Sequence, residues 1–328
     1  MRKIGLAGFA SGFWHRTSTP GSTDHPVAQR GPPAAAAIVG DKEVPELPEI
    51  QTSINDLLNS RIIGRRINDC RVLWPRSVRP LKAGDFQARI SGLVLQQLHR
   101  RGKYMVFRLN RDQTLLVHLR MTGQFHLRPA GSPEDPHDRV IFELDDRRRL
   151  CFHDTRKFGR LILTADPEDI LNRLGPEPFD PALGAEDFFR ALRRRRSRIK
   201  ALLLDQSFIA GLGNIYCDEA LFAAGIHPLR NAASLREEEA QLLLVKIREV
   251  LNTGLRNRGT SLGLGETNYL SGGRRGENSG ALHIYGKAGQ RCPRCGSVIE
   301  KIYVAGRGSH LCPRCQEITL EGSLTSPG

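Results

Sequence analysis

The chain has 328 residues, enough for two or three domains of ordinary size, and 39% hydrophobic residues, enough for a packed core. Its net charge of +14 and its pI near 9.9 indicate a polyanionic partner, nucleic acid ahead of an anionic membrane surface. No stretch approaches the ~18 apolar residues of a membrane-spanning helix, so we expect no membrane protein. Cys70, Cys151 and Cys217 are scattered and odd in number, which is typical of buried thiols in a reducing compartment.

The first residues differ in composition from the rest of the chain. Residues 1–43 are rich in Gly, Ala, Pro, Ser and Thr without a sustained period, so we expect 1–44 to be an extension that is disordered or absent from the mature protein. Val44 stands directly before Pro45, and a GTG codon encodes valine internally but methionine at a start. We therefore expect translation to start at residue 44 and removal of that residue to expose Pro45.

Two kinds of periodicity follow. Ile50, Ile54 and Leu57 recur at helical spacing and predict a helix from Pro48 to about Ser60. Between about residues 66 and 165 the apolar runs are short and separated by turn residues, which predicts an antiparallel β domain, a sandwich. The runs are 94–95, 104–109, 114–119, 139–144, 150–153 and 160–163.

Beyond a linker at 175–178 the period becomes helical. Ser234 to Glu237 has the spacing of a capping box, and it precedes the apolar face of a long helix. Residues 257–280 are rich in glycine and predict a long mobile loop.

Four cysteines form two close pairs near the C-terminus. Cys292 and Cys295 are separated from Cys312 and Cys315 by 16 residues. Two such knuckles place four thiolates at tetrahedral corners, so we expect one structural Zn²⁺; a pair of redox dithiols is the alternative. The hairpin between them is basic, which favours contact with phosphate.

A basic run and a glycine turn lie in the helical region. The segment 190–200 carries seven Lys or Arg and no acid, which indicates either a solvated face or a duplex-backbone contact. Gly211-Leu212-Gly213-Asn214 precedes another predicted helix. Asn214 is placed as its N-cap, and the backbone N–H groups of such a turn form an anion site.

Several motifs occur together in one order. They are Pro45-Glu46-Leu47-Pro48-Glu49, Arg101-Gly102-Lys103-Tyr104, His118-Leu119-Arg120-Met121-Thr122-Gly123, Asp154-Thr155-Arg156-Lys157-Phe158-Gly159, Leu174-Gly175-Pro176-Glu177-Pro178, Gly211-Leu212-Gly213-Asn214-Ile215-Tyr216 and the four cysteines. In this order, from Pro45 to about Gln316, the chain resembles the bacterial formamidopyrimidine-DNA glycosylases. The resemblance implies an α+β fold with a β-sandwich catalytic domain (45–172), a helix–two-turn–helix domain with a lesion loop (173–280), a zinc finger (281–316) and a tail (317–328).

The resemblance also implies an activity. A bifunctional DNA glycosylase and abasic-site lyase of base excision repair would remove oxidised purines, 8-oxoguanine and formamidopyrimidines, through a Schiff base on Pro45 and then β,δ-elimination. A terminal amine titrates near ~7.7–8.0, far below lysine at ~10.4, so it is a ready nucleophile at neutral pH. Glu46 would protonate the sugar ring oxygen, Lys103 would assist β-elimination, and Arg307 would assist δ-elimination.

Further residues resemble the family's DNA contacts. Met121, Arg156 and Phe158 would enter the duplex when the damaged nucleotide is flipped out, although Met121 and Phe158 would otherwise be read as core. His137, Arg195, Lys200 and Asn214 resemble contacts to the DNA backbone. The implied partner is double-stranded DNA with oxidised bases or abasic sites, bound by a monomer in the bacterial cytoplasm.

Two alternatives stay open. Endonuclease VIII-like relatives, which prefer oxidised pyrimidines, usually have Gly where Leu47 stands and lack the Met, Arg, Phe set, so these features favour purine lesions. A catalytically silent DNA-damage binder would result if the extension blocked Pro45. Two departures from the family pattern bear on lesion preference: Lys157 replaces a usual arginine, and the loop 263–280 aligns poorly.

Overall fold

The structure is a computed structural model that describes residues 44–262 and 269–318. Residues 1–43 of the predicted extension, residues 319–328 of the predicted tail and residues 263–268 of the predicted loop lie outside the described residues. Within the described ranges, none of the helices combines the length and the apolar character needed to cross a membrane.

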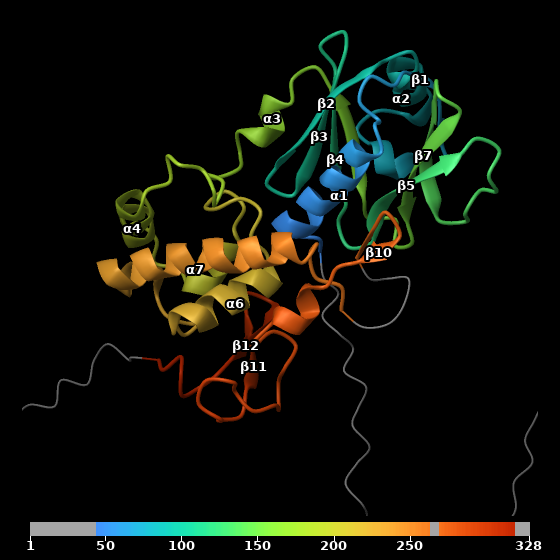
Figure 1. Cartoon of the computed structure of the whole chain (residues 1–328). Helices are drawn as coiled ribbons and strands as arrows, with labels where there is room; N and C mark the ends of the chain where they lie inside the picture. Colours follow the sequence, from blue (N-terminus) through green and yellow to red (C-terminus); the bar gives the residue numbers. More distant parts are fainter. Residues whose placement is uncertain (1–43, 263–268, 319–328) are drawn as a thin grey trace, which may run out of the picture. The chain divides into compact units, whose positions relative to one another are not determined.

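Two four-stranded antiparallel sheets form the first half of the fold, and they confirm the expected sandwich (Figure 1). In sheet order, one contains β1 (Ile67–Val72), β6 (Asp138–Leu144), β7 (Arg148–Asp154) and β5 (Gly123–Pro129). The other contains β2 (Leu95–Arg101), β3 (Tyr104–Leu109), β4 (Thr114–His118) and β8 (Arg160–Thr164). The six predicted runs lie in β2, β3, β4, β6, β7 and β8, whereas β1, β5 and α2 (Ala83–Ile90) were not predicted.

The inward side chains of both sheets share one apolar core. Phe107 of one sheet meets Phe125 of the other at 5.7 Å between ring centroids, and Phe125 meets Phe152 at 5.4 Å. Helix α1 (Leu47–Asn59) adds Ile50 and Ile54 to the same core, as its helical period predicts. The first helix is therefore fixed to the sandwich from Ile50 onward.

The second half is helical and has a core of its own. After the short α3 (Glu168–Leu171), it contains α4 (Ala185–Arg193), α5 (Ile199–Leu204), α6 (Asn214–Ala224) and α7 (Glu237–Arg256), with α6 and α7 packed together (Figure 1). The predicted capping box is wrong by two residues. The Arg236 N–H donates to Glu239 Oε2 at 2.8 Å, whereas the Ser234 hydroxyl turns back to the Asn231 carbonyl.

The chain after α7 contains short regular elements that its glycines do not predict. Two-residue strands β9 (Leu270–Ser271) and β10 (Arg274–Arg275) pair, and a 3-10 turn covers Asn278–Ala281. The mobility expected of this loop stays a prediction. The last element is an antiparallel hairpin, β11 (Glu300–Val304) and β12 (Arg307–Leu311), flanked by the two cysteine pairs.

Candidate active site

The N-terminus of α1 lies where the two cores meet. Leu47 packs into the helical core, whereas Ile50 one turn later packs into the sandwich core. The Leu47 N–H donates to the Gly211 carbonyl at 3.0 Å. Pro45 and Glu46, both buried, are thereby held against the glycine turn that precedes α6.

The Glu46 carboxylate takes the place of an N-cap for α6. It accepts the Gly213 N–H at 2.6 Å and the Ile215 N–H at 2.8 Å. A Cβ at Gly213 would lie 2.4 Å from Glu46 Cδ, so any other residue there would displace the carboxylate. The predicted anion site at this turn is therefore present, and its anion is a side chain of the protein itself. Asn214 is not the N-cap as predicted; that position belongs to Gly213.

Burial makes Glu46 a candidate acid. Desolvation raises the pKa of Glu46 to about 7, although the positive charge of Lys103 and the two backbone N–H groups oppose the rise. A carboxyl group with this pKa is protonated in an appreciable fraction of molecules at neutral pH. It is therefore able to donate a proton there, as a general acid requires.

A second buried carboxylate, Glu49, was not predicted. It accepts the Glu46 N–H at 3.0 Å, the Tyr216 hydroxyl at 2.8 Å and the Thr260 N–H at 2.6 Å. Glu49 thus ties the start of α1 both to α6 and to the segment that follows α7. The sequence signal was the acid three residues after Glu46, which is capping-box spacing.

Lys103 lies in the turn between β2 and β3, and a neighbouring carboxylate fixes that turn. Glu177 of the linker accepts the Gly102 N–H at 2.6 Å and a hydrogen bond from Arg100 at 2.6 Å. Desolvation lowers the pKa of Lys103, Glu46 and Glu49 oppose the fall, and the Arg307 guanidinium adds to it. Lys103 is therefore within electrostatic reach of both Glu46 and Arg307, and its neutral form is more accessible than that of an ordinary lysine.

The four cysteines converge as predicted. Their Sγ atoms lie within 4.8 Å of one another, with Cys292 and Cys315 at 3.9 Å and Cys295 and Cys312 at 3.4 Å. Zinc–sulfur bonds of ~2.3 Å in a tetrahedron separate the sulfur atoms by roughly 3.8 Å. The donor set therefore fits one structural Zn²⁺, which holds the ends of the hairpin that carries Arg307.

Met121, Arg156 and Phe158 come together at the edge of the sandwich. An Arg156 N–H approaches Met121 Sδ at 2.8 Å, and the Arg156 guanidinium lies 4.9 Å from the centroid of the Phe158 ring. Phe158 is 45% exposed, so it is not core. A cation between the exposed Phe158 ring and the half-buried Met121 side chain is an arrangement suited to insertion into stacked bases.

We call the group formed by Met121, Arg156 and Phe158 the wedge. The buried Asp154 holds the two turns that carry it. Its carboxylate accepts hydrogen bonds from the Thr122 hydroxyl, from the Arg156 N–H at 3.2 Å and from the Gly159 N–H at 2.7 Å. Lys157, the residue that departs from the family pattern, has a positive φ of 62°, and its ammonium lies 4.4 Å from the Trp74 ring centroid. Trp74 is a contact that the sequence did not predict.

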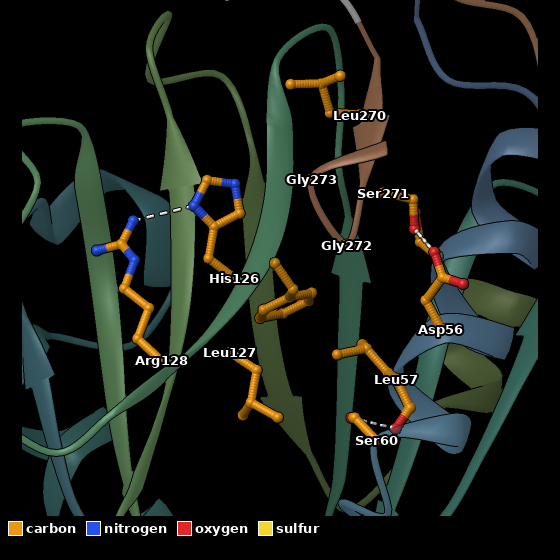
Figure 2. A pocket seen from close by; sticks show the side chains of 12 residues that line it. Asp56, Leu57, Ser60, His126, Leu127, Arg128, Leu270, Ser271, Gly272 and Gly273 are labelled. Carbon is orange, nitrogen blue, oxygen red and sulfur yellow. Dashed lines mark hydrogen bonds between the residues drawn. The ribbon is translucent and has the colours of Figure 1, made fainter. Parts of the chain in front are cut away.

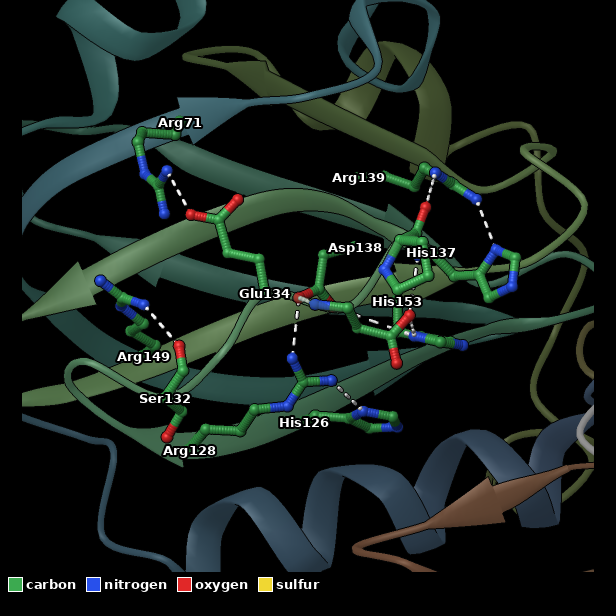
Figure 3. Close-up of polar contacts among 12 residues, drawn as sticks. Arg71, His126, Arg128, Ser132, Glu134, His137, Asp138, Arg139, Arg149 and His153 are labelled. Atoms are coloured by element: carbon green, nitrogen blue, oxygen red, sulfur yellow. Dashed lines mark hydrogen bonds and ion pairs between the residues drawn. The ribbon is translucent and has the colours of Figure 1, made fainter.

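His137 lies in the turn that precedes β6, in a network of arginine, histidine and aspartate (Figure 3). Arg139 donates to His137 Nδ1 at 3.1 Å and to the Asp154 carbonyl at 2.7 Å. Because arginine only donates, Nδ1 is the acceptor, and Nε2 carries the proton. His137 therefore presents an N–H group. Arg195 is exposed in the turn after α4, in the helical half of the protein, whereas the His137 network belongs to the sandwich.

Two of the predicted backbone contacts differ from expectation. The Lys200 side chain has no exposed surface, and its ammonium is bonded to Asp218 and to the Gly308 carbonyl. Its prediction as a DNA contact is therefore wrong, because a buried ammonium bonded to two partners inside the protein does not reach a phosphate. Asn214 is half-buried; its Nδ2 donates to the Tyr285 hydroxyl at 3.3 Å, and its Oδ1 has no hydrogen-bond partner.

A cavity of about 350 Å³ lies between α1, β5 and the β9–β10 hairpin (Figure 2). Asp56, His126 and Gly272 are among its lining residues. Asp56 is already bonded to Arg258 and Ser271, and His126 to Arg128. The cavity is lined by the C-terminal half of α1, whereas Glu46 lies at the other end, so it is separate from the acid, lysine and arginine described above.

Family models match three consecutive parts of the chain. The formamidopyrimidine-DNA glycosylase N-terminal domain matches residues 44–161, and the H2TH domain of the same glycosylases matches residues 174–264. A zinc finger found in these glycosylases and in isoleucyl-tRNA synthetases matches residues 289–318. The matches follow the order of the sandwich, the helices and the cysteine hairpin.

Curated relatives match over nearly their whole length. A formamidopyrimidine-DNA glycosylase of Protochlamydia amoebophila is 43% identical over 263 residues, which cover 80% of this chain and 95% of that protein. One of Herpetosiphon aurantiacus is 44% identical over 266 residues, with 80% and 96% covered.

Solved structures agree. The Lactococcus lactis glycosylase bound to DNA containing an abasic site matches with a TM-score of 0.76 and 36% identity over 83% of this chain and 100% of that one. MutM bound to DNA containing carbocyclic 8-oxo-G matches with a TM-score of 0.77 and 37% identity over 84% and 100%. The chain belongs to the formamidopyrimidine-DNA glycosylase family.

Proposed function

We propose that this DNA glycosylase removes oxidised purines, 8-oxoguanine and formamidopyrimidines, from double-stranded DNA and then cuts the strand as an abasic-site lyase, acting as a monomer in the cytoplasm. The observation that carries the proposal is the buried Glu46 beside Pro45, with Lys103 and Arg307 within electrostatic reach. The solved relatives bound to DNA with an abasic site or with a Fapy-dG lesion support the substrate class.

The proposed chemistry begins at the Pro45 nitrogen. Its lone pair forms a bond to C1′ of the sugar, the bond from C1′ to the damaged base breaks, and Glu46 gives a proton to the ring oxygen as the ring opens. The resulting iminium acidifies the C2′ proton. Loss of that proton expels the 3′ phosphate, and a second elimination expels the 5′ phosphate, with Lys103 and Arg307 in the roles assigned above.

Pro45 acts in this way only when its nitrogen is an amine. Joined to residue 44, that nitrogen is a tertiary amide whose lone pair is delocalised into the carbonyl group. The proposal therefore includes a mature chain that starts at Pro45. The other domain boundaries are proposed as the sequence predicts them. The match of the N-terminal family model, which begins at residue 44, supports it.

Substrate preference tests the proposal. Duplexes with 8-oxoguanine opposite cytosine, with thymine glycol and with undamaged guanine would be cut in single turnover and resolved on denaturing gels. We expect fastest cutting at 8-oxoguanine, with products that lack the sugar and carry phosphate at both ends. Faster cutting at thymine glycol would favour the endonuclease VIII-like alternative, and tight binding without cutting would favour the silent binder.

Zinc removal is expected to affect DNA binding more than folding. The hairpin core of Phe222, Ile284 and Ile299 is separate from the sandwich core, so chelation should leave the sandwich folded. Loss of the Arg307 contact should weaken affinity for a lesion duplex by about tenfold or more, the value of one charge-assisted hydrogen bond. Fluorescence anisotropy and thermal melting before and after chelation would check this. Unchanged affinity would contradict the role given to Arg307.

A further inference from the structure

We propose that Lys200 and Asp218 are positioning residues: their buried ion pair anchors β12 and so places Arg307 at the lyase site. Lys200 lies on α5 and Asp218 on α6, and neither side chain has exposed surface. Lys200 Nζ and Asp218 Oδ1 are 2.6 Å apart. The inference rests on the proposed function, because it concerns the arginine assigned to δ-elimination.

The pair is bonded to the three residues that directly follow Arg307. Lys200 Nζ donates to the Gly308 carbonyl at 2.8 Å. Asp218 accepts the Ser309 hydroxyl at 3.0 Å through Oδ1 and the His310 N–H at 2.8 Å through Oδ2. Besides the bond between the two charges, one bond of Lys200 and two of Asp218 are thus directed at β12, which joins the zinc hairpin to the helical domain.

The anchor and the metal hold neighbouring parts of the hairpin. Lys200 and Asp218 bind residues 308–310 of β12, and Cys312 and Cys315, which follow the strand, belong to the zinc site. The turn before the strand has positive φ at Ala305 and Gly306, and Arg307 is exposed directly after it. Without the anchor, β12 keeps its pairing with β11 and its cysteines but loses the hydrogen bonds that fix it against α5 and α6.

The ion pair at this position contributes more to the placement of β12 than to the stability of the fold. A buried pair is seldom more stabilising than apolar residues of similar volume, and loss of one partner leaves an uncompensated charge. An apolar pair would keep the helices packed but would give Gly308, Ser309 and His310 no bonds. Stability and placement of Arg307 are therefore separable by mutation.

That separation defines the test. Lys200→Met, the double variant Lys200→Met/Asp218→Leu and the milder Ser309→Ala would be compared with the unmodified protein on a duplex containing an abasic site. Lys246→Met is the matched control, because its ion pair with Glu249 lies on the surface of α7. The readouts are melting temperature, zinc content, borohydride trapping and the ratio of δ- to β-elimination products.

Lys200→Met should melt at lower temperature, and the double variant should recover most of that loss while keeping its zinc and its trapping. Its δ/β product ratio should nevertheless stay at least about tenfold low, the effect of a misplaced catalytic group. Ser309→Ala should lower the ratio less, and Lys246→Met should not change it. A stable double variant with the unmodified ratio would overturn the anchor.

Hydrogen exchange separates the anchor from the proposed function. The His310 amide should exchange faster in the double variant than in the unmodified protein, whether or not the protein is a lyase. Unchanged exchange would overturn the anchor by itself. Absence of trapping in the unmodified protein would instead overturn the proposed function.

Discussion

Glu46→Gln should lower the rate of 8-oxoguanine excision by about 10³-fold, since general acid catalysis contributes typically 10²–10⁴-fold. A glutamine amide keeps the size of the side chain but supplies no acidic proton. An abasic sugar has no base to lose and opens without this acid, so borohydride trapping on a preformed abasic site should largely survive. Single-turnover excision and trapping, measured side by side, would give the two rates.

The pH profile should identify the same proton. Because the Glu46 pKa is raised to about 7, the acid form is lost as pH rises through that value. The terminal amine titrates near ~7.7–8.0, so excision should be nearly constant between the two pKa values. Above both values the rate should fall toward tenfold per unit through loss of the acid, and below both it should fall through protonation of the amine. Glu46→Gln should lack the alkaline limb. If the variant kept that limb, another group would be the acid.

A matched control is available at another helix. Glu239 also caps a helix N-terminus, where it accepts the Arg236 N–H at 2.8 Å, but it lies outside the site on α7. Glu239→Gln is expected to leave both excision and trapping unchanged. A similar loss of excision in this control would indicate that damage to capping, rather than loss of a proton donor, explains Glu46→Gln.

A chain that retains residue 44 should lose excision and trapping altogether. An acylated Pro45 nitrogen has no available lone pair, so no bond to C1′ forms and the rate should fall to that of the uncatalysed reaction. The wedge of Met121, Arg156 and Phe158 is unaffected by this change, so affinity for a lesion duplex should be kept. Parallel preparations with and without residue 44 would be compared by trapping and by anisotropy.

Trapping by the extended form would contradict this prediction, because it would place the nucleophile elsewhere. Loss of affinity together with trapping would indicate that residue 44 blocks DNA entry, a steric rather than a chemical effect. Only the loss of trapping with retained binding matches the proposed use of Pro45.

The spacing of apolar residues predicted much of the fold, because that spacing decides which face of a helix or strand is buried. Ile50 and Ile54 mark the buried face of α1, and the short apolar runs mark six of the eight sandwich strands. Strand β1 was missed because its pairing shifts register between Ile67 and Asp69. That bulge interrupts the two-residue alternation on which strand prediction depends.

Contacts between distant segments explain the errors at the site. Asn214 has a good local reason to cap α6, but the Glu46 carboxylate, 167 residues from Gly213, takes that place. Lys200 looks like part of a solvated basic run, yet its partners are Asp218 and Gly308, the latter 108 residues away. Spacing and charge along the chain do not reveal such pairs; burial in the folded protein does.

The most direct measurement is the mass of the covalent adduct. Active protein from the native gene would be trapped with borohydride on an 8-oxoguanine duplex, digested and sequenced by mass spectrometry. We expect one modified peptide that begins at Pro45 and carries the reduced sugar on its N-terminal nitrogen. A sugar on Lys103, or an adduct peptide that still contains Val44, would contradict the account.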